Sequence, residues 1–510
     1  MKQKLIQILG ASIALTFSNA TIAYGEKLAN NDSFSSKDLI LDSLELAQSS
    51  EPNIIKPAQQ SIPDTTELNP NPDPLSRPTQ ANEVEVDPQK PITLQQAIAL
   101  SLNNNRDVET ARIQIEQSTA ALREARAGLY PNLDFGSGLN YGDELFLDSV
   151  VEQAADRNLG TNLTDSTSAN FEFNTDLTLG YDIYDGGFRG ANIRSAEKEL
   201  KTDELNLEVV IEQTRFETAR DYYSLQNSDA QVEIEKAAVA DATQTLRDAE
   251  LLEEAGLGTR FDVLRAEVEL AQARQRLNTA IANQSIARRQ LAETLSIDHN
   301  SDLATADAIE EAGTWSLSLP ESIIRAFSNR AELEQFLLQR EISAAQRQIA
   351  LSQIRPTISA AASYGVDDDF EDSFDISDRY TVGVSLQWRL FDGGAASAEA
   401  RQAEKEIAIA ETQFADQRNQ IRFAVEQAYF GLESNQKNIG TATKEQELAE
   451  ESLRLARLRF QAGVGTQTDV IEAQTDLTTA RGNLLDSIIN YNQSLIDLKR
   501  QVSRVPNAGF

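Results

Sequence analysis

The chain repeats itself at a constant offset of 207 residues. The segment GLGTRFDVL at 256–264 returns as GVGTQTDVI at 463–471. The same offset joins the Asp-Gly-Gly triplets at 185–187 and 392–394, and it still joins Leu277 to Leu484. Neither copy has therefore gained or lost a residue over this distance, which is typical of a duplicated and rigidly packed unit. Two copies are too few for a solenoid, so the sequence predicts a duplication inside one architecture.

Each copy opens with a helical pattern that ends at a proline. The first pattern runs from the N-cap residue Thr93 to Tyr130, before Pro131, and the second covers residues 319–355, before Pro356. The residue before a proline avoids the helical conformation, so both helices are expected to stop there. These segments match at an offset of 225, which places 18 more residues between the proline and the Asp-Gly-Gly triplet in the first copy.

Between each proline and its Asp-Gly-Gly triplet, apolar residues alternate with polar ones. A period of two indicates strands with one apolar face, and each copy holds two such strands. The sequence thus predicts one β-hairpin per copy and four strands in all. The apolar positions of the longer strands include Phe171, Phe173, Leu177, Leu179 and Tyr181 in the first copy and Tyr380, Val382, Val384, Leu386 and Trp388 in the second.

A long helical hairpin follows each β-hairpin. Residues 188–255 and 395–462 contain no proline, and at ~1.5 Å per residue each helix would reach roughly 100 Å. The returning helix of the second copy shows a seven-residue apolar spacing, which predicts coiled-coil packing between neighbouring helices. The spaced residues are Val470, Leu477, Leu484, Tyr491 and Leu498.

Composition argues against several classes of function. Lys and Arg number 46 against 80 Asp and Glu, so the net charge of −34 leaves no basic surface for nucleic acid. There is no cysteine, and the single histidine, His299, lies in a polar loop. The glycines at 256, 258, 463 and 465 lack the Lys-Ser/Thr ending of a phosphate loop. We therefore expect no enzyme, no metal and no cofactor.

The two-faced strands could cover a soluble core, or they could face lipid on one side and water on the other. The sequence offers only long helices that already have coiled-coil partners, so the membrane interpretation fits better. An open sheet edge in hydrocarbon leaves unpaired backbone groups that cost several kcal/mol each, and four strands cannot close a barrel. The chain must then oligomerise, with two or three copies sharing one barrel.

On these motifs the chain resembles the TolC family of outer-membrane efflux channels over residues 91–503. The resemblance is carried by YPNL at 130–133, RP at 355–356, FDGG at 391–394 and FQAGVGTQTDVIEAQ at 460–474. It implies a homotrimer with a 12-stranded barrel in the outer membrane and a helical tunnel in the periplasm. It also implies a periplasmic adaptor and an inner-membrane pump as partners.

The resemblance aligns Asp469 and Glu472 with acids that ring the closed periplasmic entrance. They are three residues apart and share one helix face, and several copies would gather their carboxylates into a cation-favouring ring. Asp262 is the first-copy equivalent of Asp469, but Arg265 replaces the second acid. A contact between Arg260 or Arg265 and an acid of the other hairpin would hold this entrance closed. Alternatively, Asp469 only caps its helix.

Both hairpin tips keep a Gly-x-Gly-Thr pattern and are expected to dock onto the adaptor. The tip residues are Gly256, Gly258, Thr259, Gly463, Gly465 and Thr466. The preferred function is export of small toxic compounds, with export of unfolded proteins or glycolipids as an alternative. A soluble periplasmic coiled-coil scaffold is a third hypothesis, although it would not need the two-faced strands.

The patterns divide the chain into six segments. Residues 1–23 read as a secretory signal with a basic start and a short apolar run, and residues 24–90 as a Pro-rich linker. The two repeats are expected at 91–296 and 319–503, with a connecting segment at 297–318 and a short tail at 504–510.

Overall fold

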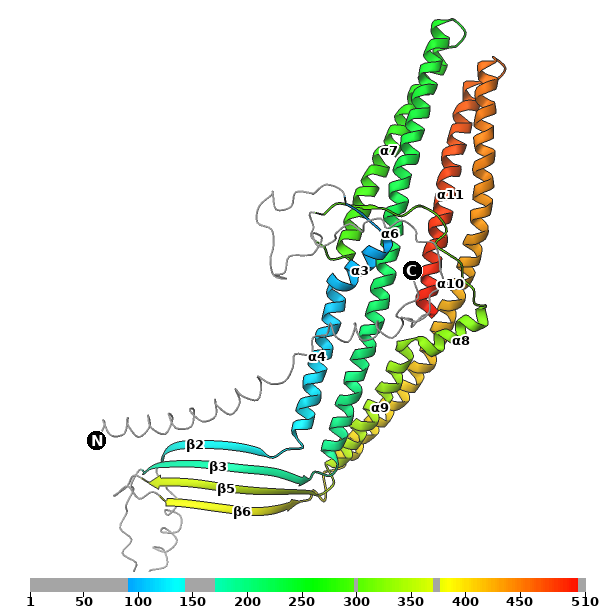
Figure 1. Ribbon diagram of the computed structural model, residues 1–510. Helices are drawn as coiled ribbons and strands as arrows, with labels where there is room; N and C mark the ends of the chain where they lie inside the picture. Colours follow the sequence, from blue (N-terminus) through cyan, green and yellow to red (C-terminus); the bar gives the residue numbers. More distant parts are fainter. Residues whose placement is uncertain (1–89, 143–169, 298–300, 370–376, 503–510) are drawn as a thin grey trace, which may run out of the picture. The chain divides into compact units, whose positions relative to one another are not determined.

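The structure is a computed structural model that describes residues 90–142, 170–297, 301–369 and 377–502 (Figure 1). The described residues are mainly helical, with long helix pairs and two β-hairpins in a repeated arrangement, as the sequence predicts. The predicted signal, the tail and all of the linker except Lys90 lie outside them. In chain order the elements are β1 (Lys90–Ile92), α3 (Leu94–Asn104), α4 (Arg106–Ala127), β2 (Asn132–Gly142), β3 (Asn170–Tyr184), α6 (Phe188–Glu254), α7 (Arg260–Thr294), β4 (Leu303–Thr305), α8 (Leu319–Asn329), α9 (Ala331–Ser352), β5 (Thr357–Asp369), β6 (Ser377–Gln387), α10 (Ala395–Gln461) and α11 (Gln467–Val502).

The opening helix of each copy is broken, and here the prediction of one continuous helix is wrong. Thr93 caps α3 through a capping box with Gln96, but α3 ends at Asn104. Asn105 is extended and its side-chain oxygen accepts hydrogen bonds from the N–H groups of Asp107 (2.9 Å) and Val108, so it starts a new helix, α4. The second copy breaks at the equivalent place, between α8 and α9.

Each Asp-Gly-Gly triplet forms the turn between the second strand of a β-hairpin and the long helix that follows it. Gly187 and Gly394 have φ angles of 91° and 90°, which L side chains rarely adopt. The carboxylate of Asp185 accepts a hydrogen bond from the N–H of Arg189, and that of Asp392 accepts one from the N–H of Ala396, both at 2.7 Å. The helices α6 and α10 that begin here each have 67 residues and end one residue before the predicted positions.

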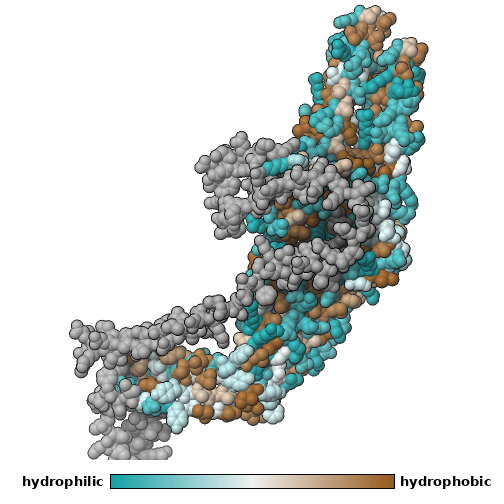
Figure 2. All heavy atoms as spheres, in the orientation of Figure 1, coloured by the Kyte–Doolittle hydropathy of each residue, from teal (hydrophilic) through white to brown (hydrophobic). Residues whose placement is uncertain are grey.

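The four strands form one antiparallel sheet in the order β2-β3-β5-β6. Its register aligns the apolar positions of all four strands on one face, since Leu179 lies opposite Leu133 and Ala362, and Ala362 lies opposite Val382. Among the described residues most of this face is uncovered, although the guanidinium of Arg189 lies over the ring of Tyr181. Hydrophobic residues lie open on the surface of the sheet in Figure 2. The strands are therefore two-faced, as predicted.

The other face of the sheet is polar, and glycines make room for its side chains. A Cβ on Gly136 would come within 2.8 Å of a carboxylate oxygen of Asp176, and one on Gly180 within 2.7 Å of Oδ1 of Asn132. The glycines therefore leave room for the acids and amides of the neighbouring strand to lie across them.

The long helices pack as pairs, α6 with α7 and α10 with α11, and α9 lies against both α6 and α10. In the second pair, Val470 and Leu477 of the predicted seven-residue spacing are buried in one cluster with Leu453 of α10. Tyr491 and Leu498 are buried in the next cluster, with Leu484 packed against it. The predicted helix pairing is confirmed.

The segment between the repeats contains one short strand, β4. β1 pairs in parallel with β4. This pairing could not be predicted, because a strand of three residues is too short to show an alternating pattern in the sequence. The buried hydroxyl of Tyr222 in α6 donates to Asp307 (2.7 Å), and Tyr491 in α11 donates to the carbonyl of Gly313 (2.6 Å). The connecting segment is thus tied to one long helix of each copy.

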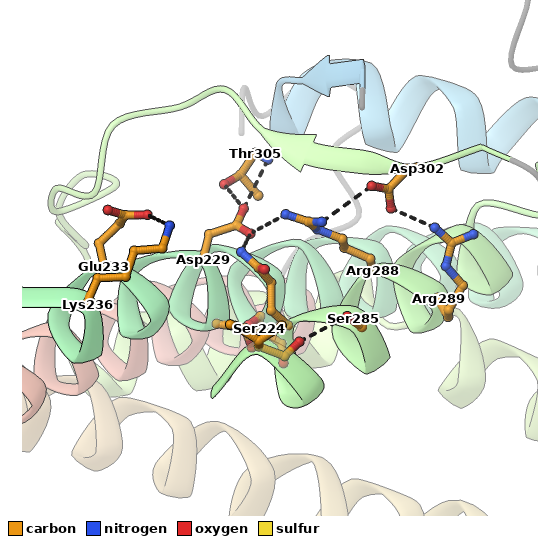
Figure 3. Close-up of polar contacts among 12 residues, drawn as sticks. Ser224, Asp229, Glu233, Lys236, Ser285, Arg288, Arg289, Asp302 and Thr305 are labelled. Atoms are coloured by element: carbon orange, nitrogen blue, oxygen red, sulfur yellow. Dashed lines mark hydrogen bonds and ion pairs between the residues drawn. The ribbon is translucent and has the colours of Figure 1, made fainter. Parts of the chain in front are cut away.

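A network of charged groups fixes β4 on the first helix pair (Figure 3). Asp229 of α6 accepts a hydrogen bond from the hydroxyl of Thr305 at 3.1 Å and pairs with Arg288 of α7. Asp302 bridges Arg288 (3.3 Å) and Arg289 (2.6 Å). Because these groups are partly buried, their pairing holds the segment in one position more firmly than surface ion pairs would.

Candidate functional site

The tips of the two helical hairpins have the same backbone. Gly256 and Gly463 have φ angles of 70° and 71° and end the ascending helices. The N–H of Leu257 donates to the carbonyl of Leu252, and the N–H of Val464 to that of Arg459, which closes the last helical turn with a left-handed residue. Both tips therefore need glycine at this first position.

The second glycine of each tip does not have a positive φ angle. Glycine is needed there because atoms of the preceding helix lie too close for a side chain. A Cβ on Gly258 would lie 3.1 Å from the Cβ of Leu252, and one on Gly465 would lie 3.0 Å from the Cβ of Arg459. The residue between the two glycines, Leu257 or Val464, is an exposed apolar side chain. Each tip thus presents a rigid turn with one apolar residue in solvent.

A capping box starts each descending helix. The N–H of Thr466 donates to the carboxylate of Asp469 at 3.0 Å, and the N–H of Asp469 donates to the hydroxyl of Thr466 at 3.2 Å. Thr259 and Asp262 make the same reciprocal pair. These bonds satisfy backbone donors that a helix N-terminus leaves free. The capping interpretation of Asp469 is therefore realised in the structure.

The capping bonds also set the ionisation of Asp469. Hydrogen bonds from the N–H and then the hydroxyl of Thr466 lower the pKa of its carboxyl below the ordinary value of 3.8. The group is charged at neutral pH. Glu472, one turn further along α11, is exposed. Within one chain the two acids therefore form a charged helix start, and the predicted ring of acids would need further copies.

The two arginines near the first tip make different contacts from those expected. Arg265 of α7 does reach the other hairpin, but its guanidinium donates to the hydroxyl of Thr468 at 2.7 Å and not to an acid. Arg260 pairs with Glu253 of its own hairpin at 3.6 Å. The arginine that replaces the second acid thus links the starts of α7 and α11.

Two further contacts between the hairpins were not predicted from the sequence. Arg457 of α10 pairs with Asp241 of α6 at 2.7 Å, and the amide of Gln474 in α11 donates to the hydroxyl of Thr245 at 2.8 Å. These residues lie in long helices in which every turn carries polar side chains, so the sequence does not single them out. The contacts become visible only when the two hairpins are placed side by side. With Arg265, they hold the tip regions of the two copies together.

The apolar face of the sheet is the second candidate site. Leu177, Leu179, Tyr181, Tyr380, Val382, Val384 and Leu386 lie on it and are exposed, and Phe173 is half-buried there. Phe171 lies at the same register, but its side chain is outside the described residues. Trp388 lies one residue beyond the end of β6, and its indole N–H donates to the carbonyl of Ile354 at 3.0 Å.

In the described parts of the chain, no group of three or more His, Cys, Asp or Glu residues could hold a metal ion. Among the same residues, no helix is both long and apolar enough to cross a bilayer. Long helical hairpins with rigid tips, joined to a two-faced sheet whose outer strands are unpaired among the described residues, fit the architecture of an outer-membrane channel protein.

The comparison with known proteins agrees with this class. The family described as outer membrane efflux protein matches residues 97–296 and 323–502, so the chain belongs to that family. It is an outer-membrane efflux channel of the TolC type and a non-enzymatic transport protein. The soluble scaffold hypothesis is thereby excluded.

Two relatives and one solved structure match along most of their length. The chain is 23% identical to the solvent efflux pump outer membrane protein SrpC of Pseudomonas putida, over 78% of this chain and 82% of that protein. It is 25% identical to the pyoverdine export outer membrane protein OpmQ of Pseudomonas aeruginosa, over 75% and 78%. The outer membrane channel CmeC of Campylobacter jejuni shares the fold, with a TM-score of 0.70, 17% identity and coverage of 86% and 94%.

Proposed function

We propose that the chain is the exit duct through which small toxic compounds leave the periplasm, and that it works as a homotrimer with a periplasmic adaptor and an inner-membrane pump. The proposed class of cargo, small compounds, rests on the exported compounds that the names of two relatives state. SrpC is named for solvent efflux and OpmQ for pyoverdine export, and each matches this chain over three quarters of its length or more. Their cargoes are small molecules.

Several copies are needed because the sheet is incomplete. Its outer strands, β2 and β6, have unpaired edges among the described residues, and such edges are not tolerated in hydrocarbon. Three copies of a four-stranded sheet give twelve strands, an even number within the range of outer-membrane barrels. The apolar face would then meet lipid, and the polar face would line a water-filled lumen.

The tips supply the docking surface for the adaptor in this proposal. Two turns with the same backbone, each carrying one exposed apolar residue between its glycines, occur in every chain. A partner with equivalent grooves could engage both. The acids that follow the tips, Asp469 and Glu472, would line the entrance and favour cations.

The test is deletion of the gene in the organism that carries it. We expect the deletion strain to become several-fold more sensitive to apolar solvents and amphiphilic drugs, and to regain resistance with the wild-type chain on a plasmid. Because export of unfolded proteins is the competing function, the proteins of the culture medium are compared by mass spectrometry. Unchanged sensitivity together with a missing secreted protein would overturn the cargo assignment.

A further inference from the structure

A cavity of about 300 Å³ lies where three helices meet, α6 of the first copy and α9 and α11 of the second. Its volume is at the lower end of the range for ligand pockets, roughly 300–1,000 Å³, so a small molecule would fill it. Part of its wall is apolar and is formed by Val209, Ile211 and Ala331. All of the lining belongs to one chain, so the cavity does not depend on assembly with further copies.

Three arginines line this cavity, one from each helix or its first turn, and two of them are already paired. Arg215 of α6 donates to the carboxylate of Glu212 at 2.7 Å. Arg330, directly before α9, donates to both carboxylate oxygens of Glu332, at 2.9 and 2.6 Å. The charges of these two arginines are therefore balanced by acids that also line the cavity.

The third arginine, Arg500 of α11, has no such partner. Its guanidinium lies over the ring of Phe216, 5.5 Å from the ring centroid, and among the described residues no oxygen accepts a hydrogen bond from it. Burial, and then the charge of Arg330, lower the pKa of this guanidinium against the attraction of the acids around it. A partly dehydrated cation whose donors lack an acceptor would bind an anion more strongly than a cation on the open surface does.

The start of α9 lines the same cavity and has no side-chain cap. In α4, the copy of α9 in the first repeat, the side chain of Asn105 accepts hydrogen bonds from the N–H groups of Asp107 and Val108. Arg330 stands at the equivalent position and makes no capping bond, because a guanidinium has no acceptor. The first N–H groups of α9 are thus left without the cap that their copies have.

Neither arginine is needed to build the helix break, because the first copy breaks at the same place without them. The offset of 225 gives Asn105 for Arg330, and the offset of 207 gives Glu293 for Arg500. A cation in the last turn of α11 also favours the helix C-terminus, but Lys499 in the same turn already supplies one. The chemistry of the cavity is therefore particular to the second copy.

We propose that this cavity binds a small organic anion, a carboxylate with a short aliphatic or aromatic body. The guanidinium of Arg500 and the uncapped N–H groups of α9 would hold the carboxylate oxygens. The apolar body would lie against Val209, Ile211 and Ala331. The bound anion would join α6 of the first copy to α9 and α11 of the second.

The acids of the lining leave room for this anion. Glu212 and Glu332 are held by Arg215 and Arg330, so each of these carboxylates already has a counter-charge within hydrogen-bond distance. Glu208, the third acid of the lining, is exposed, and water and salt screen a charge at the surface. An organic cation would meet carboxylates that are largely engaged and would face Arg500.

Binding of benzoate to the purified full-length channel in a neutral detergent tests the proposal by titration calorimetry. Benzamide has the same shape without the charge. We expect saturable binding of benzoate, and binding of benzamide weaker by about tenfold or more, because the bonds to a charged donor are lost. Arg500→Gln should weaken benzoate binding by about tenfold and leave benzamide unchanged. The assay needs no adaptor, pump or export, so its outcome is independent of the proposed function.

The matched control is Lys499→Gln, which removes one positive charge from the same helical turn but not from the cavity lining. It should bind benzoate like the wild type. Val209→Phe narrows the cavity without changing any charge, and we expect it to lose benzoate binding. Each variant is first checked for normal oligomers and for its melting temperature.

The outcomes separate clearly. No saturable binding of benzoate to the wild type would overturn the proposal. Benzoate binding that survives both Arg500→Gln and Val209→Phe would place the benzoate elsewhere, and equal weakening by Lys499→Gln would reduce the effect to net charge. Inorganic sulfate that binds as tightly as benzoate would show that the apolar wall makes no contribution, which refutes an organic ligand.

Discussion

Asp469 combines a structural contact with a charge that function could use. Its carboxylate accepts the capping bonds from Thr466, and these bonds lower its pKa. A lowered pKa means that the carboxylate stabilises the fold at all pH values above the ordinary 3.8, and that this contribution is lost as the pH falls through the lower folded-state value. At neutral pH the cap is intact and the charge is present. The capping and entrance roles are therefore compatible, and only Glu472 is free of the cap.

Replacing Asp469 and Glu472 together with alanine tests the entrance role. Like charges gathered within a Debye length, ~8 Å at physiological salt, repel one another and attract cations. We expect the double variant to lose much of its cation preference in single-channel recordings and to be blocked less by multivalent cations. Asp262→Ala serves as the control, because that copy keeps the same capping box but lacks the second acid. A double variant with full cation preference and a lower thermal stability would leave capping as the sole role of Asp469.

The capping boxes could be anticipated from the sequence, whereas the contacts between hairpins could not. Threonine followed three residues later by an acid is a local signal, and the structure realises it at both tips. The partner of Arg265 depends on which turn of α11 lies beside α7. That alignment arises from the packing of two helix pairs far apart in the sequence, so the hydroxyl of Thr468 could not be chosen over a neighbouring acid.

At the scale of whole elements, the strands are the part of the chain that faces two environments. Leu179 of β3 lies on the apolar face, and its neighbour Thr178 lies on the polar face with Asp134 opposite. An arginine on the lipid face costs about 2–4 kcal/mol at the membrane midplane, whereas lumen positions tolerate charge. We expect Leu179→Arg to reduce oligomers in the outer membrane and Thr178→Arg to leave them near the wild-type level, as measured on non-denaturing gels of membrane extracts.

The pair of variants contradicts the membrane assignment if the two arginines behave alike. Equal loss from both would mean that the two faces have the same environment. Normal assembly of Leu179→Arg would mean that the apolar face does not meet lipid. Because both residues sit in the middle of the same strand, a general effect of arginine on strand pairing cancels in the comparison.

Elements with a strong period were predictable, and those fixed by distant contacts were not. The bounds of α6 and α10 follow from proline-free helical sequence between an Asp-Gly-Gly triplet and a Gly-x-Gly tip. The break at Asn105 was missed because an asparagine within a periodic helix differs little from other polar residues until its side chain is seen to cap α4. β1 and β4 have only three residues each. Strands this short leave no alternation to read, and they form because Asp302 and Thr305 are held by α6 and α7.

At the scale of the molecule, duplication gives each chain two similar but unequal halves. The first half ends in a tip with Leu257 and an arginine-bearing helix, the second in a tip with Val464 and an acidic helix start. The tips keep one backbone while the residues behind them diverge. We infer that the turn itself is what a partner recognises, because it is the feature that both halves retain.

The last prediction concerns these turns. Gly256→Val with Gly463→Val forces a branched side chain into φ angles near 70°, which is strained at both positions even though the surrounding space is open. The tips lie at the opposite ends of the long helices from the strands, so oligomers should still form in the outer membrane. We expect export to fail and drug resistance to fall to the level of the deletion strain. Gly440→Val is the control, because Gly440 lies within α10 with open space around it and no positive φ, and it should retain export. Normal export by the double tip variant, with normal oligomers, would show that the tip turns do not dock the partner.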